Sequence, residues 1–203
     1  MRNKGILVFC VLSSILLIHM LLTSSAIAWV RDSEFLEICK SGTLQEVNDA
    51  IIEGANVNAR SEERDITPLI VAAGSNTNSQ VITALIQAGA DITKKSNRNE
   101  TPLMYAAHYN LDQKAVAAMI KTLYQAGDDV NAKDLDGRTP LLFAVNSTNL
   151  QAVLSLLEYG ADATVRDHFG MRPLDIAVTK KAFAGTEAMR KLREATSVKI
   201  IGY

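Results

Sequence analysis

The chain has 203 residues, of which 48% are hydrophobic, and its 21 basic and 22 acidic residues give a formal net charge of −1. It contains no dense basic block, which excludes the electrostatic footprint of a nucleic-acid-binding protein. This length is sufficient for a packed hydrophobic core.

The first 28 residues are predicted to be a signal peptide. Arg2 and Lys4 provide a basic start, an apolar run covers residues 5–22, and Ala26-Ile27-Ala28 places small residues at both positions that define a cleavage site. The alternative is that residues 5–22 stay uncleaved as a membrane anchor, because this run is close to the length that spans a bilayer.

Cleavage after Ala28 would leave a chain that begins at Trp29. Without Arg2 and Lys4 it has 19 basic and 22 acidic residues, a charge of −3. Cys39 is then its one cysteine, so the exported protein has no internal disulfide and must be stabilised by packing. We interpret Cys39 as a small buried residue.

The first folded unit is predicted to be a pair of helices. Asp32 or Ser33 can cap a helix over residues 34–40, and Thr43 begins a second one. Offsets of 0, 3, 7 and 8 place four apolar residues on one face of that second helix, which is helical spacing: Leu44, Val47, Ile51 and Ile52.

Two signals then recur along the chain. A glycine that can take positive φ ends each second helix, as in Gly54-Ala55-Asn56, Gly89-Ala90-Asp91, Gly127-Asp128-Asp129 and Gly160-Ala161-Asp162. A residue that tolerates positive φ, as a tight hairpin turn requires, precedes each later proline by three positions: Asp65, Asn99, Gly137 and Gly170.

The strongest signal is a motif repeated four times. It reads Thr67-Pro68-Leu69, Thr101-Pro102-Leu103, Thr139-Pro140-Leu141 and Arg172-Pro173-Leu174, with the prolines 34, 38 and 33 residues apart. Such a period indicates stacked supersecondary units. Each threonine stands where a helix N-cap belongs, and proline suits the first helical position. Paired alanines, Ala72-Ala73 and Ala106-Ala107, allow the next unit to approach closely.

Together these motifs resemble the ankyrin repeat over about Ser33 to Ser197. The resemblance implies an all-α solenoid of about five helix–turn–helix units with short β-hairpin fingers. The units are placed at about 33–65, 66–99, 100–137, 138–170 and 171–197, within a repeat domain of 29–197 and before a C-terminal tail of 198–203.

Two units depart from the common pattern. The third is about four residues longer, which predicts a lengthened second helix or a longer loop before it. The fifth begins with Arg172 in place of threonine, and Asp175 in the first turn is expected to compensate partly through the helix dipole. Its second helix, near Thr186 to Ala195, is charged, as a terminal capping unit requires.

No catalytic, metal or cofactor site is predicted, and we expect no enzyme. A nucleophilic pair would need Cys39 to meet a histidine, but His108 and His168 lie in distant units, and solenoid contacts join neighbours. The acid pairs Glu62-Glu63 and Asp128-Asp129 are expected to be solvated.

The resemblance implies that a partner docks on the finger tips and on the concave ends of the first helices. Tyr109 and the arginines are favoured, because these residue types dominate interface energies, and four arginines at repeating positions would form a positive ridge for an acidic patch on the partner. Phe169 is weighed equally as a binding residue and as one that packs on the next finger. The predicted partner-binding residues are Arg64, Arg98, His108, Tyr109, Leu135, Arg138, Arg166, His168, Phe169 and Met171.

The sequence therefore predicts an exported module, periplasmic in a bacterium or secreted, that binds another protein as a monomer and without catalysis. One alternative is a scaffold anchored to the membrane by residues 5–22. Another is a small-molecule-binding or enzymatic protein with a site near His108, which would require a deep polar pocket there.

Overall fold

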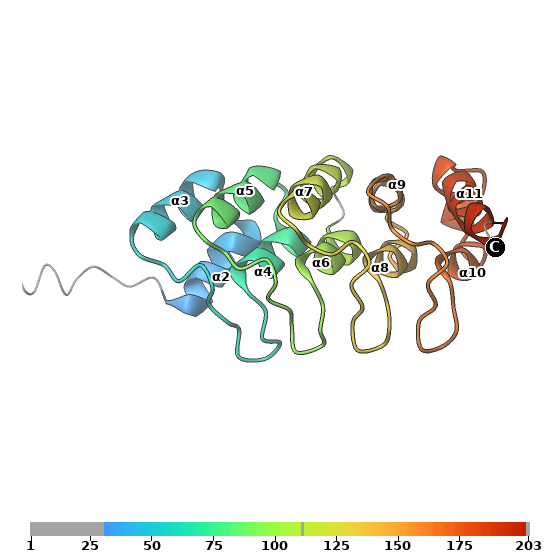
Figure 1. Ribbon diagram of the computed structural model, residues 1–203. Coiled ribbons are helices and arrows are strands. Elements are labelled where there is room, and N and C mark those ends of the chain that lie inside the picture. The colour runs from blue at the N-terminus through green and yellow to red at the C-terminus, as the bar shows by residue number, and fades with distance from the viewer. Residues whose placement is uncertain (1–30, 111, 202–203) are drawn as a thin grey trace, which may run out of the picture.

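The computed structural model of the protein describes residues 31–110 and 112–201, the last four by their backbone alone. The predicted leader and the end of the tail, 202–203, lie outside these residues. Within them the chain forms five pairs of helices (Figure 1): α2 (Asp32–Ser41) with α3 (Leu44–Ile52), α4 (Pro68–Ser75) with α5 (Ser79–Gln87), α6 (Pro102–Tyr109) with α7 (Gln113–Gln125), α8 (Pro140–Asn146) with α9 (Leu150–Glu158), and α10 (Pro173–Ala177) with α11 (Glu187–Ile201), the last pair joined through the 3-10 helix η1 (Lys181–Phe183).

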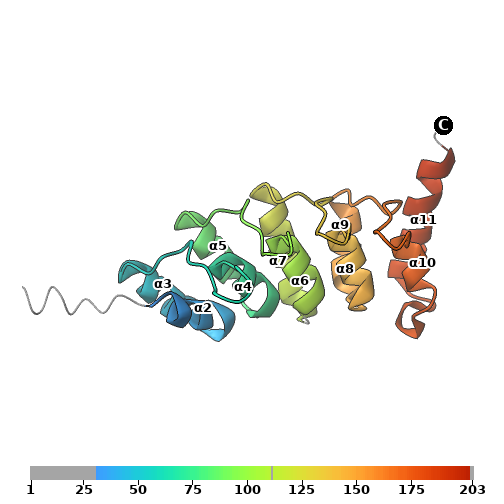
Figure 2. The ribbon, with the colours of Figure 1, turned by 90° about the horizontal axis from the view of Figure 1, so that it is seen from below.

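The helices form two rows, with the first helix of every unit in one row and the second in the other (Figure 1). The fingers project from the row of first helices, and the units follow one another in chain order (Figure 2). Each repeated proline begins a first helix, so the four prolines recur along one edge of the stack. The predicted all-α solenoid is confirmed.

The fingers are tight turns, and the described residues contain no β-strand, so the expected β-hairpins are not formed as strand pairs. Each finger is closed at its base by backbone bonding, for example from the Asp134 N–H to the Arg138 carbonyl at 3.0 Å. One backbone bond then links each finger to the next: Asn97 N–H to Arg64 O, Leu135 N–H to Arg98 O and His168 N–H to Asp136 O. Such isolated bonds do not make the repeating ladder of a sheet.

The predicted helix caps are present. The hydroxyls of Thr67, Thr101 and Thr139 accept the backbone N–H three residues later, at 3.3, 3.3 and 3.4 Å. The turn residues Asp65 and Asn99 have φ of 54° and 64°, as expected. These local signals place the first helices of the second, third and fourth units.

The two ends of the repeat array start their first helices differently. Arg172 lacks a hydroxyl, but its backbone N–H donates to the Asp175 carboxylate at 3.0 Å. Asp175 therefore caps the start of α10 and also places a negative charge at the positive end of the helix dipole. In the first unit our cap prediction is wrong. Asp32 and Ser33 lie within α2, whose N-cap is Arg31, and Asp32 occupies the first turn, where a negative charge suits the helix dipole.

The longer third unit contains a longer second helix. α7 has 13 residues, against nine in α3, α5 and α9. The segment before it, 110–112, matches 76–78 and 147–149 in length, so the loop is not extended. The apolar stripe stays in phase and is buried at Val116, Met119, Ile120 and Leu123.

The core runs through the whole stack between the two rows of helices. Cys39, Ala72, Ala73, Ala106 and Ala107 are fully buried, which confirms their interpretation as small residues at close helix contacts. Burial raises the pKa of the Cys39 thiol to about 12.

Two expectations about buried residues are wrong. Ile52 is 82% exposed because it lies in the last turn of α3, beyond the packed face. Asp128 is 7% exposed, not solvated, and its side chain accepts the Leu103 N–H at 2.9 Å. α11 continues to Ile201, so residues 198–201 of the predicted tail are helical.

A row of buried asparagines joins neighbouring units. Asn76 donates to the Cys39 and Gly42 carbonyls, both at 3.0 Å. Asn110 donates to the Ala73 carbonyl at 3.2 Å and to the Asn76 carbonyl at 2.8 Å. Asn149 donates to the Asn110 carbonyl at 2.7 Å. The row thus pairs carbonyls that the ends of the preceding first helices leave without an intrahelical partner.

Candidate binding groove

A groove of about 1180 Å³ lies between α2, α4, α6 and the first finger, residues 60–66. Three successive first helices supply its floor, and their positions are set by the caps and the asparagine row. It is lined by Asp32, Ser33, Leu36, Glu37, Lys40, Arg60, Ser61, Glu62, Glu63, Arg64, Ile66, Val71, Gly74, Ser75, Thr77, Tyr105, Tyr109, Asn110 and Asp112.

The floor of the groove is apolar and aromatic. Leu36 and Val71 are almost fully buried beside Tyr105, whereas Tyr109 is 40% exposed, and the two tyrosine rings have centroids 5.1 Å apart. Gly74 permits this arrangement, because a Cβ at its position would lie 3.2 Å from Tyr105 Cδ1 and 3.4 Å from Tyr109 Cβ. The tyrosines of α6 can therefore lie directly against α4.

Charges surround this floor, and some of them are paired internally. Lys40 forms an ion pair with Glu37 at 3.2 Å, and Arg60 pairs with Asp65 at 3.0 Å. Arg64 interacts instead with the Tyr109 hydroxyl, which raises the pKa of the Arg64 guanidinium. Arg64 and Tyr109, two of the predicted binding residues, thus meet in the groove.

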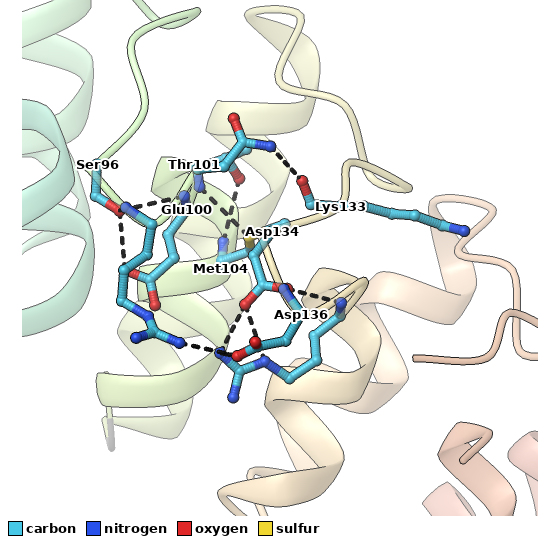
Figure 3. A network of polar contacts seen from close by, with 10 residues as sticks. Ser96, Glu100, Thr101, Met104, Lys133, Asp134 and Asp136 are labelled. Carbon is cyan, nitrogen blue, oxygen red and sulfur yellow. Dashed lines mark hydrogen bonds and ion pairs between the residues drawn. The ribbon is translucent and has the colours of Figure 1, made fainter. Parts of the chain in front are cut away.

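The four arginines do not form the expected ridge of free positive charge, because three of them are in ion pairs. Arg98 pairs with Asp136 at 2.8 Å, and Arg138 pairs with Asp134 at 2.6 Å and with Asp136 at 2.9 Å (Figure 3). Arg166 pairs with Asp175 at 3.6 Å. The physical reason is that carboxylates lie within reach of these guanidinium groups: on the adjacent finger for Arg98, on its own finger for Arg138, and on α10 for Arg166. Three of the four arginines are therefore paired internally and are less available to an acidic partner.

His108 is a packing residue at this site. Its ring lies edge-on to Tyr109 and to Phe143, with centroids 4.4 and 5.4 Å away, and burial lowers the pKa of its imidazole. The groove reaches Tyr109 but does not include His108. Nδ1 of His108 is buried and has no hydrogen-bond partner among the described residues. A chemical site near His108 would require a deep polar pocket, and this groove does not provide one.

The other predicted binding residues lie on the later fingers. Leu135 and Phe169 are 60% and 79% exposed, while Met171 is half-buried. His168 is exposed and lies close to the third finger, since a Cβ on Gly137 would lie 2.7 Å from His168 Cδ2. Phe169 does not pack on a further finger, because its own finger is the last described. Of the predicted residues, only Arg64 and Tyr109 line the groove. His108 packs beside it, Arg98 is on the second finger, and the other six belong to the last two fingers.

The sequence reasoning missed most of the groove floor and its acidic rim. Leu36, Val71 and Tyr105 read as core residues, and only their position beside the first finger makes them part of the groove. The asparagine row had a usable signal: Asn76, Asn110 and Asn149 recur 34 and 39 residues apart.

Comparison with known families decides the assignment. The family model described as ankyrin repeats (3 copies) matches residues 35–134 and 113–198. The chain belongs to the ankyrin-repeat family. Ankyrin repeats generally mediate protein–protein interaction, and the family is typically non-enzymatic. No curated protein matches this ankyrin-repeat chain with significant similarity.

Two features of the described part of the ankyrin-repeat chain bear on the alternatives. None of its helices is long and apolar enough to cross a membrane, and residues 5–22, on which the anchor alternative depends, lie outside it. The same residues contain no group of three or more His, Cys, Asp or Glu side chains arranged to hold a metal ion.

Proposed function

We propose that this ankyrin-repeat protein is an exported module that binds a protein partner in the groove between its first three units, without catalysis. The observation that carries the proposal is the groove itself, in which Tyr109 stands 40% exposed over an apolar floor. Its volume of about 1180 Å³ exceeds the roughly 300–1000 Å³ of small-molecule pockets. A segment of another protein is the occupant that fits such a site.

The rigidity of the groove supports binding. The helices that line it are capped at Thr67 and Thr101 and joined by Asn76 and Asn110, so the surface exists before the partner arrives. A preformed surface loses little conformational entropy on docking. Leu135 and Phe169 add exposed apolar contacts on the later fingers for a partner that extends along the stack.

Affinity capture tests the site. The bait carries Tyr109→Ser, and a matched control carries Tyr124→Ser, whose side chain on α7 is 41% exposed and lies outside the groove. We expect Tyr109→Ser to reduce recovery of the partner about tenfold, as loss of an aromatic anchor does, while the control retains it. Equal recovery by wild type and both variants would refute the proposed binding site.

Export is proposed from the sequence of residues 1–28, and it places the protein in the periplasm or outside the cell. N-terminal sequencing of the mature protein tests this part independently. A chain that begins at Trp29 supports cleavage, and one that keeps Met1 supports the membrane-anchored scaffold.

A further inference from the structure

We infer that the segment bound in the groove is basic and carries an apolar anchor side chain. This inference rests on the proposed function and specifies the partner's chemistry. It reverses the expectation of an acidic partner, because the charges of the groove differ from those of the finger arginines.

The charge balance of the groove is negative. Its lining includes five acidic and three basic residues. The bases are largely engaged: Lys40 by Glu37, and Arg60 by Asp65. In contrast, no described residue forms an ion pair with Asp32, Glu62 or Glu63. All three are exposed, so they remain available to cations from outside.

The acids and the apolar floor line the same groove. Glu62 and Glu63 are on the first finger and Asp32 begins α2, whereas Val71 lies on α4 and Tyr109 on α6. A lysine or arginine that enters can meet a carboxylate and also contact the exposed face of Tyr109, which attracts cations through its π-system. An apolar neighbour in the same segment would cover the floor.

The alternative occupants are disfavoured by the same charges. An acidic segment would bring like charges to Glu62 and Glu63. Its own carboxylates would find one lining base that has no ion pair with a described residue, Arg64, and this base already interacts with Tyr109. A second copy of the chain from residue 29 onward carries a net charge of −3, which opposes self-association at this rim.

Direct titration of the full chain with two labelled synthetic peptides tests the inference. Both peptides carry the same central phenylalanine, flanked by lysines in one and by glutamates in the other. Fluorescence anisotropy is measured at low and high salt for wild type, for Glu62→Gln with Glu63→Gln, and for Tyr109→Ser. A matched control, Glu53→Gln with Glu158→Gln, removes the same charge from exposed residues outside the groove.

We expect the lysine peptide to bind more tightly, with an affinity that falls with salt. The Glu62 and Glu63 variant should weaken it about fivefold, as for two exposed ion pairs, with no change in the control. Equal affinity for both peptides, tighter binding of the glutamate peptide, or no binding of either would overturn the inference. So would a dimer in sedimentation that Tyr109→Ser dissociates. If the charge preference fails while Tyr109→Ser still reduces partner capture, the proposed function stands and only the inference that the partner is basic is wrong.

Discussion

Replacing Asn110 by alanine should destabilise the protein by about 3 kcal/mol. Its side chain donates to the carbonyls of Ala73 and Asn76, at 3.2 and 2.8 Å, and accepts the Asp112 N–H at 3.1 Å. Asn110 is only 3% exposed, so water cannot readily replace these bonds. Two buried carbonyls and one part-buried N–H would lose their partner, each at a cost of about 1 kcal/mol.

Asn58 provides a matched control. It also bonds to the next unit, from its amide to the Gly89 carbonyl at 3.1 Å and from the Asp91 N–H to its side-chain oxygen at 2.8 Å. Because Asn58 is exposed, water can take over both bonds, and Asn58→Ala should cost less than about 1 kcal/mol.

Urea denaturation followed by far-UV circular dichroism measures both variants. Asn110→Ala should also broaden the transition, since it weakens the interface between the second and third units, and solenoids depend on coupling between neighbours. Similar losses of unfolding free energy for Asn110→Ala and Asn58→Ala would refute the reasoning that burial gives the asparagine row its importance.

Three further predictions follow from buried or strained positions. Burial raises the pKa of Asp128 from 3.8 to about 7, so its stabilising contribution is complete below pH about 3.8 and is lost as pH rises through about 7. The free energy of unfolding should fall over that range by on the order of 4 kcal/mol, and Asp128→Asn should flatten the profile in chemical denaturation; an unchanged slope would contradict this. Gly137→Ala should lower the melting temperature more than Gly170→Ala. The two glycines have nearly the same φ, 75° and 77°, but only a Cβ at position 137 would clash with His168. Equal shifts in melting temperature would show that this contact between fingers is unimportant. Iodoacetamide should not modify Cys39 in the native protein and should do so after unfolding, as located by mass spectrometry; native labelling would mean that this helix contact opens readily.

Much of the fold was predictable because its signals are local. A threonine before proline caps a helix within three residues, as at Thr67, and a residue with positive φ turns a finger, as at Asn99. Both act over one turn of chain, and their recurrence indicates stacking without knowledge of any contact. The sequence did not decide whether the four extra residues of the third unit lengthen α7 or the loop before it, since they preserve the helical phase in either case.

The candidate site was predicted only in part, because it depends on which groups meet across units. Arg98 looked like a free cation until the neighbouring finger placed Asp136 at 2.8 Å from it. Asp128 looked like a solvated turn residue, yet it is buried against the start of α6. Residue type and spacing do not reveal such partners, which are far apart in the sequence.

By itself, then, the sequence determined the number and order of the stacked helix pairs, because capping and turn formation need only neighbouring residues. Only the tertiary structure decided which charges remain free, which asparagines join the units and where the groove lies. The asparagine row and the groove join groups more than thirty residues apart, such as Asn76 and Asn110, whose distance is set by packing of one unit on the next.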